Sequence, residues 1–167
     1  MKQVEHVTHD SIPPVYDENS CILILGSMPS KKSREASFYY MHPQNRFWKI
    51  LETVFQEKIT AKKEFILKHH IALWDTIASC DILGASDASI KNVIPNDIAK
   101  LVRKTKIKKI FTAGATAEKY YRKYIYPELK MESIRLSSTS PANCQKSLQD
   151  LVEEWKIIRE TLEEGKL

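Results

Sequence analysis

Residues 22–55 read ILILGSMPSKKSREASFYYMHPQNRFWKILETVF, and this stretch decides the fold. Its first four residues are all apolar, which is typical of a parallel strand covered by helices on both faces. Its last third carries apolar residues at the spacing of one helix face: Phe47, Ile50, Leu51, Val54 and Phe55. We therefore expect a buried strand over 21–25, a long loop from Gly26, and a helix that begins near Pro43–Asn45.

Further apolar runs predict three more strands, over 71–74, 107–112 and 133–136. Helical patterns lie between and after them: 61–68, a short helix capped by Asn96, a helix after Gly114 that Pro127 ends, and a closing helix over 148–162. Strands that alternate with helices predict an α/β fold, here a three-layer αβα sandwich with a central four-stranded parallel sheet. We expect one domain over 1–167.

Two polar segments are expected to lack strands and helices. Residues 1–20 are interpreted as a polar N-terminal extension in which Val15 and Tyr16 dock on the body. Ser79–Pro95 is rich in Ser, Asp, Asn and Gly and is interpreted as a long surface loop, and such loops in compact domains are commonly functional. Loops that follow Leu25, Leu73–Asp75 and Leu136 share the carboxyl edge of the sheet, where open α/β sheets bind ligands.

The amino-acid composition limits the classes of protein to which this chain can belong. The net charge is +5, from 26 Lys and Arg against 21 Asp and Glu, which permits a polyanionic partner without requiring one. Three distant cysteines fit neither a disulfide framework nor a C-x-x-C metal clip, so we expect reduced, largely buried thiols and no zinc or iron–sulfur site. We also expect no cofactor. No apolar run reaches the length of a membrane span, and we expect a cytoplasmic monomer.

Several aromatic and histidine side chains are assigned structural roles. Phe47 and Trp48 lie at helical spacing and are predicted to be core residues. Four histidines without partner spacing are predicted to be solvated: His6, His9, His69 and His70. The sequence contains no H-E-x-x-H, no P-loop and no G-x-S-x-G, which argues against the zinc-protease, NTPase and α/β-hydrolase classes.

The long loop has a chemistry of its own. Phe38, Tyr39 and Tyr40 offer flat faces on which a base can stack. Backbone N–H groups near Ser27 and Met28 could receive developing negative charge. Asn45 could orient a water through its carbonyl while it donates through its NH₂, or it could cap the following helix. A stacked base, an anion-stabilising wall and a held water predict cleavage of an N-glycosidic bond.

The blocks GSMPS (26–30), HPQNRFW (42–48) and STSPAN (138–143), together with LWDTIASCD (73–81), DASIKNVIPND (87–97) and IFTAGATAEK (110–119), resemble the uracil-DNA glycosylase superfamily. Within it they are most similar to the hypoxanthine-DNA glycosylase group, which is related to the mismatch-specific enzymes. The resemblance covers roughly residues 20–160. It implies a metal-free, monofunctional enzyme that flips a damaged base out of double-stranded DNA into its site.

The resemblance also implies roles for individual residues. Ser27 stands where mismatch-specific enzymes carry the Asn that holds the attacking water, and Asn45 is expected to replace it as the catalytic residue. The residues expected to line the base site are Gly26, Met28, Pro29, Tyr39, Tyr40 and His42, with Tyr40 as the stacking ring. The residues expected to contact DNA are Ser30, Ser33, Arg34, Ser138, Thr139, Ser140, Pro141 and Asn143.

Two departures leave the substrate open. The second motif lacks the His that other branches use to stabilise the leaving base, so backbone donors must supply more. The end of the third strand carries Ala113 where the group often has an Asn. We expect hypoxanthine or uracil as the target base, with xanthine and G·T mismatches as alternatives. A nucleic-acid-binding module without chemistry on the same fold is the alternative from a different class.

Overall fold

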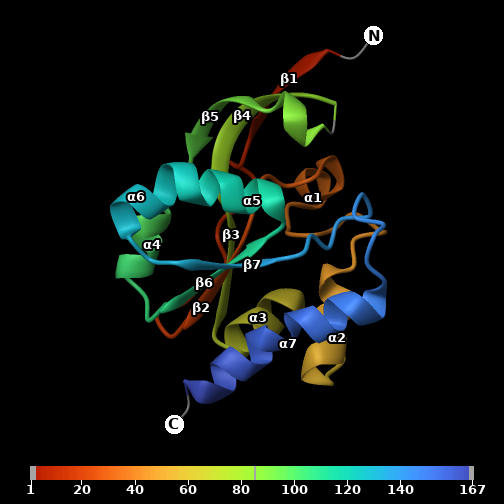
Figure 1. The fold of residues 1–167 in the computed structure, drawn as a ribbon, viewed down its shortest axis with the longest axis vertical. Helices are drawn as coiled ribbons and strands as arrows, with labels where there is room; N and C mark the ends of the chain where they lie inside the picture. Colours follow the sequence, from red (N-terminus) through yellow and green to blue (C-terminus); the bar gives the residue numbers. More distant parts are fainter. Residues whose placement is uncertain (1–2, 85, 166–167) are drawn as a thin grey trace.

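The computed structural model describes residues 3–84 and 86–165 and is drawn in Figure 1. Its centre is a four-stranded parallel sheet in the order β3-β2-β6-β7. These strands are β2 (Ile22–Gly26), β3 (Ile71–Asp75), β6 (Lys109–Ala113) and β7 (Ser133–Leu136). The predicted α/β fold with four parallel strands is confirmed, and each predicted strand lies within two residues of its observed start.

Helices cover both faces of this sheet because side chains of β2 alternate between two cores. Ile22 and Ile24 pack against α2 (Phe47–Phe55), α3 (Lys62–Lys68) and α7 (Leu148–Glu164). Leu23 and Leu25 pack on the opposite side. That second face is covered by α4 (Ile98–Arg103) and by the continuous helical segment α5 (Ala115–Tyr120), η2 (Tyr121–Ile125) and α6 (Tyr126–Leu129). Figure 1 shows strands of this sheet between α5 and α6 on one side and α3 and α7 on the other.

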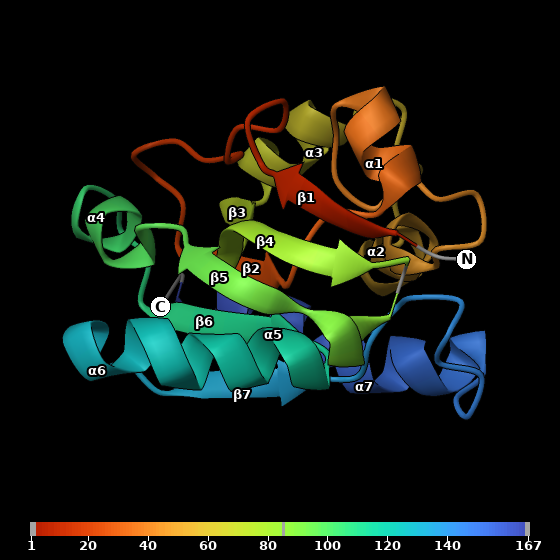
Figure 2. The same ribbon diagram turned by 90° about the horizontal axis from the view of Figure 1, so that it is seen from above.

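A second sheet, which the sequence reading missed, stands beside the first (Figures 1 and 2). β1 (Val4–Thr8) and β5 (Lys91–Pro95) both pair antiparallel with β4 (Ile77–Leu83), with the short helix η1 (Asp87–Ser89) between β4 and β5. The predictions of an irregular N-terminal extension and of a loop over 79–95 are therefore wrong for the described residues; Met1, Lys2 and Ala85 lie outside them. Because one face of this sheet meets solvent, its strands carry many polar residues and read as loop.

Two predicted helix boundaries also change. Asp97, not Asn96, caps α4, since its side chain accepts a hydrogen bond from the Lys100 amide at 3.2 Å. Asn96 instead donates to the carbonyls of Asp75 and Ile77, at 2.9 and 3.3 Å, across the bend between β3 and β4. Pro127 does not end the helix after Gly114, because the chain passes through the π-helical turn η2 and continues as α6, with Pro127 in the first turn of α6.

The N-terminal segment beyond β1 runs back over the parallel sheet. Val15 forms an isolated antiparallel bridge with Leu73, and Tyr16 packs against the second core, so the predicted docking of both residues is confirmed. None of the helices among the described residues is long and apolar enough to cross a membrane.

Candidate active site

The carboxyl ends of the parallel strands meet three loops. From β2 the chain runs to β3, and from β6 it runs to β7 in the other direction, so the sheet has its topological switch point between β2 and β6. Ligands bind at such a point in open α/β sheets. The β2 loop carries α1 (Lys31–Ala36), and Figure 1 shows this helix on the same side of the molecule as the loop that follows β7.

The first half of the β2 loop is fixed from within by two serines. Ser30 caps α1 by accepting from the Ser33 amide at 3.1 Å, and its hydroxyl donates to the Ser33 hydroxyl at 3.2 Å. Ser33 is 1% exposed and accepts from the Met41 amide at 2.9 Å. Burial of Ser33 does not fit its predicted contact with DNA. Its hydroxyl instead ties α1 to the segment that carries the aromatic residues.

The three aromatic residues of the loop point to different places. Phe38 stacks on Trp48, with ring centroids 5.8 Å apart. Tyr39 is 2% exposed and donates to the Pro13 carbonyl at 3.0 Å, so it lies in the core and does not fit a direct contact with a base. Tyr40 is half-buried, and its ring lies parallel to Phe47 with centroids 3.9 Å apart.

Tyr40 carries two kinds of strain. Its φ of 55° is in the left-handed region that side chains other than glycine rarely adopt. Its hydroxyl is enclosed and has no hydrogen-bond partner among residues 3–84 and 86–165. Burial, and then the charge of Asp75, raise the pKa of Tyr40 well above its usual value, so the hydroxyl keeps its proton. Strain that a fold tolerates at a ligand-binding edge is a recognised mark of function.

Asn45 links the β2 loop to the loop after β7. Its side-chain oxygen accepts from the Phe47 amide at 2.9 Å and from the Thr139 hydroxyl at 2.8 Å. The Phe47 amide is a donor, which fixes the orientation of the carboxamide. Both lone pairs of this oxygen are used, so the predicted role of the oxygen in orienting a water does not fit the structure. The Nδ2 group, which donates to no described residue, is the end available to a ligand.

Arg46, which the sequence reading did not single out, clamps the same two loops together. Its guanidinium donates to the carbonyls of Lys146 and Asn143, both at 2.7 Å, and of Ser140 at 3.3 Å. Its backbone amide donates to the Thr139 carbonyl at 3.1 Å. These acceptors are backbone groups, so no pattern of side chains in the sequence could predict these contacts.

The loop after β7 presents only part of its predicted contact surface. Thr139 is 2% exposed, which does not fit a contact with DNA; its hydroxyl serves as the tether to Asn45. Pro141 is exposed, while Ser138, Ser140 and Asn143 are half-buried and share hydrogen bonds within the loop. The loop is also anchored to α7, where the Glu154 carboxylate accepts from the amide and the hydroxyl of Ser137.

The remaining predicted site residues lie around this junction. Gly26 is buried, Met28 packs on the cluster beneath β4, and Ser27 and Pro29 are half-buried. The Nδ1 atom of His42 accepts from the Gln44 amide at 3.1 Å, so the neutral ring carries its proton on Nε2. Arg34 reaches Glu5 of β1 at 3.4 Å. Ser27, Tyr40, His42 and Asn45 all lie in the segment between β2 and α2.

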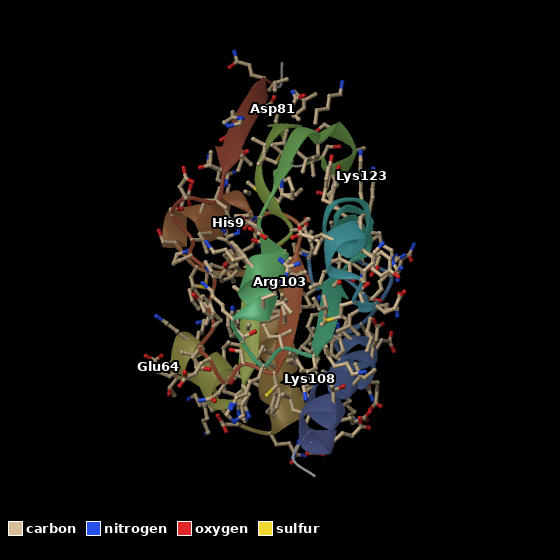
Figure 3. All side chains as sticks on the ribbon, turned by 90° about the vertical axis from the view of Figure 1, so that its left-hand side faces the viewer. His9, Glu64, Asp81, Arg103, Lys108 and Lys123 are labelled. Atoms are coloured by element: carbon tan, nitrogen blue, oxygen red, sulfur yellow. The ribbon has the colours of Figure 1, made fainter. Side chains whose placement is uncertain are left out.

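His9 and Asp75 form a buried pair beneath this loop. The prediction that His9 is solvated is wrong, since its side chain is 5% exposed and that of Asp75 is 4% exposed. Their Nε2 and Oδ2 atoms lie 2.6 Å apart. Figure 3 shows His9 between Asp81 of the outer sheet and Lys108 at the far edge of the parallel sheet. Local sequence patterns do not predict this pair, because 66 positions separate the two residues. The one sequence feature that points to it is an acidic residue, Asp75, at the end of a buried strand.

The hydrogen bonds of His9 and Asp75 show where their protons lie. The Nδ1 atom of His9 lies 2.6 Å from the Ile12 carbonyl, which only accepts, so Nδ1 carries a proton. A second proton must lie between Nε2 and Asp75. Burial lowers the pKa of His9, but the hydrogen bond and the charge of Asp75 outweigh it, and the pKa is raised above 6.5. An imidazolium paired with a carboxylate is the resulting state.

This ion pair predicts a stability that depends on pH. Because the pKa of His9 is raised on folding, its contribution is fully present below about pH 6.5 and is lost as the pH rises through the folded-state value. Removing one partner of a buried pair costs about 3–5 kcal/mol. We expect His9→Gln to lower the free energy of unfolding by such an amount near pH 6 and by less at pH 9.

Urea unfolding of both proteins between pH 5.5 and 9 measures this difference. His6→Gln is the matched control, since His6 and Asp81 form a similar contact of 2.7 Å on the surface. It should change stability little at any pH. A His9→Gln deficit that grows with pH would contradict the assignment of the protons.

A separate recess lies away from this junction. It has a volume of about 1060 Å³ and lies at the amino edge of the parallel sheet, where its lining includes Cys21, His70, Lys108 and Arg159. None of the predicted site residues lines it. The volume of a recess therefore does not identify the candidate site. The candidate site at the carboxyl edge of the sheet is identified by the side chains that lie there.

Comparison with known proteins identifies the family. A model of the uracil DNA glycosylase superfamily matches residues 13–161, which is most of the chain. The chain belongs to the uracil DNA glycosylase superfamily. It is a DNA glycosylase, an enzyme that hydrolyses N-glycosyl bonds of DNA. This assignment agrees with the resemblance noted in the GSMPS, HPQNRFW and STSPAN blocks.

Individual relatives of this glycosylase narrow the comparison. It is 33% identical over 152 residues to a hypoxanthine DNA glycosylase of Methanosarcina acetivorans, which covers 87% of this chain and 94% of that one. It is 38% identical over 85 residues to a hypoxanthine DNA glycosylase of Methanosarcina barkeri, a match that spans 48% of this chain and about half (54%) of the relative.

A solved structure supports the same fold. The solution NMR structure of a Methanosarcina acetivorans protein, described as a candidate uracil DNA glycosylase, superposes with a TM-score of 0.76 at 31% sequence identity. The match covers 91% of this glycosylase and 96% of that chain.

Proposed function

We propose that this chain is, as one domain, a monofunctional glycosylase of base-excision repair that removes a deaminated base, hypoxanthine in the first place and uracil in the second, from double-stranded DNA. The observation that carries the proposal is the free Nδ2 group of Asn45 at the carboxyl edge of the sheet, held in one orientation by two hydrogen bonds to its oxygen. The names of the two Methanosarcina relatives favour hypoxanthine.

A donor at this position suits deaminated bases as a class. Deamination replaces an amino donor of adenine or cytosine by a carbonyl acceptor. An NH₂ group can donate to that carbonyl, whereas it would face the amino group of the parent base donor to donor. Leaving a polar group of the site unpaired is an effective way to reject an analogue. Asn45 would thereby separate hypoxanthine from adenine, and uracil from cytosine, with one hydrogen bond.

The same donor would assist bond cleavage. As the bond between C1′ and the base nitrogen breaks, its electron pair passes to the base, and the negative charge that develops spreads to the carbonyl oxygen. A preorganised donor at that oxygen stabilises the transition state more than the ground state. The Nε2–H of His42 offers a second donor on the same loop. The ring of Tyr40, backed by Phe47, would support the flipped base.

The DNA backbone would lie against the exposed rim of the two loops. The proposed DNA contacts that keep exposed or half-buried surface there are Ser30, Arg34, Ser138, Ser140, Pro141 and Asn143. Ser33 and Thr139 would act behind them by holding the loops in shape. We further propose that the enzyme acts as a monomer in the cytoplasm, without metal or cofactor.

A substrate panel tests the proposal. Purified protein is incubated with 30-bp duplexes that carry one deoxyinosine, deoxyuridine, deoxyxanthosine or G·T mismatch, and abasic sites are then cleaved with hot alkali. We expect cleavage of the deoxyinosine strand, slower cleavage of the deoxyuridine strand, and none of the undamaged duplex. Strands that stay intact for every lesion, beside an active control glycosylase, would overturn the enzymatic proposal and favour a binding module.

A further inference from the structure

A carboxylate and a phenol converge on one backbone position at the edge of the site. A Cβ atom added to Gly26 would lie 2.4 Å from Oδ1 of Asp75 and 3.1 Å from the hydroxyl of Tyr40. Gly26 opens the GSMPS block, and Asp75 is its partner in the register of β2 and β3. A side chain at position 26 would collide with Oδ1 of Asp75, so only glycine fits beside the two groups.

Both oxygens have unused hydrogen-bonding capacity. The hydroxyl of Tyr40 has no partner within the described chain. The Oδ2 atom of Asp75 is taken by His9, but Oδ1 accepts no hydrogen bond from any described residue. The enclosed hydroxyl of Tyr40 and Oδ1 of Asp75 therefore flank Gly26 without a hydrogen bond between them. A water beside Gly26 that accepts from the one and donates to the other would satisfy both.

The site lacks any other described group that could activate a water. The oxygen of Asn45 is saturated by Phe47 and Thr139. Nδ1 of His42 accepts from Gln44, and Nε2 carries the proton. Ser27 has a hydroxyl, which is a weak base. Asp75 is the carboxylate nearest to the GSMPS loop, and its partner His9 lies before residue 13, where the match to the superfamily begins.

We propose that Asp75, held by His9, is the catalytic base that takes a proton from the attacking water, and that the hydroxyl of Tyr40 orients the same water. This role rests on the glycosylase function proposed above. In the step, the bond between C1′ and the base nitrogen breaks and its electron pair leaves with the base. The water oxygen bonds to C1′, one water proton passes to Oδ1 of Asp75, and the departed base takes up a proton from solvent.

His9 acts as a positioning residue in this scheme. Its protonated ring fixes Oδ2 and leaves Oδ1 toward Gly26. The groups that face the pair are the hydroxyls of Tyr39 and Tyr40, and burial raises the pKa of both, so neither brings a competing negative charge. The N-terminal segment thereby supplies part of the catalytic apparatus from outside the family's matched region.

Single-turnover rates on the lesion that the wild-type enzyme cleaves fastest test the role of Asp75. A positioned base contributes about 10²–10⁴-fold to a rate. We expect Asp75→Asn, which keeps the shape of the side chain, to lose at least 100-fold, while its affinity for a duplex with an abasic-site analogue stays within threefold. Asp81→Asn is the matched control from the surface His6–Asp81 pair and should keep the wild-type rate.

Further variants keep the test decisive if Asp75→Asn fails to fold. Tyr40→Phe removes only a hydroxyl without a partner among the described residues, so it should melt at or above the wild-type temperature. It should lose about 100-fold in rate, the lower end of the contribution of one preorganised donor. Tyr121→Phe, whose hydroxyl donates to the Met131 carbonyl at 2.5 Å, is its control and should keep the rate. Gln can present an N–H near the place of Nε2, so His9→Gln should cleave at least tenfold faster than His9→Ala.

The outcomes separate the two proposals. Wild-type protein that cleaves no lesion overturns the glycosylase function and the role of Asp75 with it. A wild-type enzyme that cleaves, beside a folded Asp75→Asn or Tyr40→Phe variant with an unchanged rate, overturns only the role of Asp75 and Tyr40. If Asp75→Asn loses both rate and DNA affinity, the His9–Asp75 pair has only a structural role, and the proposed catalytic role of Asp75 is overturned.

Discussion

Asn45→Asp is expected to lower the glycosylase rate by about 10²–10³-fold while the protein stays as stable as the wild type. The aspartate keeps an oxygen for the Phe47 amide and for the Thr139 hydroxyl, so the link between the two loops survives. A negative charge at the start of α2 is also favourable. What disappears is the Nδ2 donor, and a second carboxylate oxygen would repel the carbonyl of a deaminated base.

Asn45→Asp separates the proposed catalytic role of Asn45 from its structural role in joining the two loops. Asn45→Ala would remove both roles at once. Single-turnover rates and urea unfolding are measured on the same preparations. Thr139→Val is the matched control, since it breaks the link to Asn45 but keeps the donor, and it should lose stability with only a modest loss of rate. An active Asn45→Asp enzyme would show that Asn45 serves only as a helix cap and loop tether, and would remove it from the reaction.

Phe47→Ala is expected to lower the free energy of unfolding by about 3–5 kcal/mol, the usual cost of deleting a fully buried aromatic ring. Phe47 is 0% exposed. It stacks on Tyr40 at 3.9 Å and packs edge-on against Trp48 and Trp155, at 4.9 and 5.7 Å between ring centroids. The same ring therefore joins α2 to α7 and supports Tyr40 in its strained conformation.

Chemical unfolding measures the stability of this variant, and activity at low temperature measures its site. Phe55→Ala, at the half-buried far end of α2, is the comparison and should cost less. We expect the folded fraction of Phe47→Ala to cleave more slowly than that of Phe55→Ala, because only the former loses the ring behind Tyr40. A loss below about 1 kcal/mol would contradict the central place given to Phe47.

The parallel sheet could be predicted from the sequence because its strands are covered on both faces. Ile22–Leu25 is an unbroken apolar run, and Phe47 to Phe55 repeats with the helical period. The three-stranded sheet could not, because β4 and β5 expose one face and carry residues such as Asp81 and Asn92 that are typical of loops. β4 pairs with β1 through residues more than 70 positions apart, and local sequence patterns cannot predict such a distant pairing.

The site was predictable where its residues form a contiguous motif. Tyr40, His42 and Asn45 stand within six positions of one another, and the loop was singled out for that reason. The direction in which each group points was not predictable. Asn45 turns its oxygen inward, Tyr39 enters the core, and Thr139 is buried, because hydrogen bonds between distant loops decide these orientations. Arg46 and the His9–Asp75 pair depend on the same kind of contact.

The release of a free base is the most direct test of the proposed glycosylase reaction. A duplex with a single deoxyinosine is incubated with excess enzyme, and the small-molecule fraction is separated by chromatography without alkali treatment. We predict one equivalent of free hypoxanthine and an intact DNA strand with an abasic site, and no adenine from the matched undamaged duplex. Absence of free base from deoxyinosine and from deoxyuridine, with DNA still bound, would contradict it.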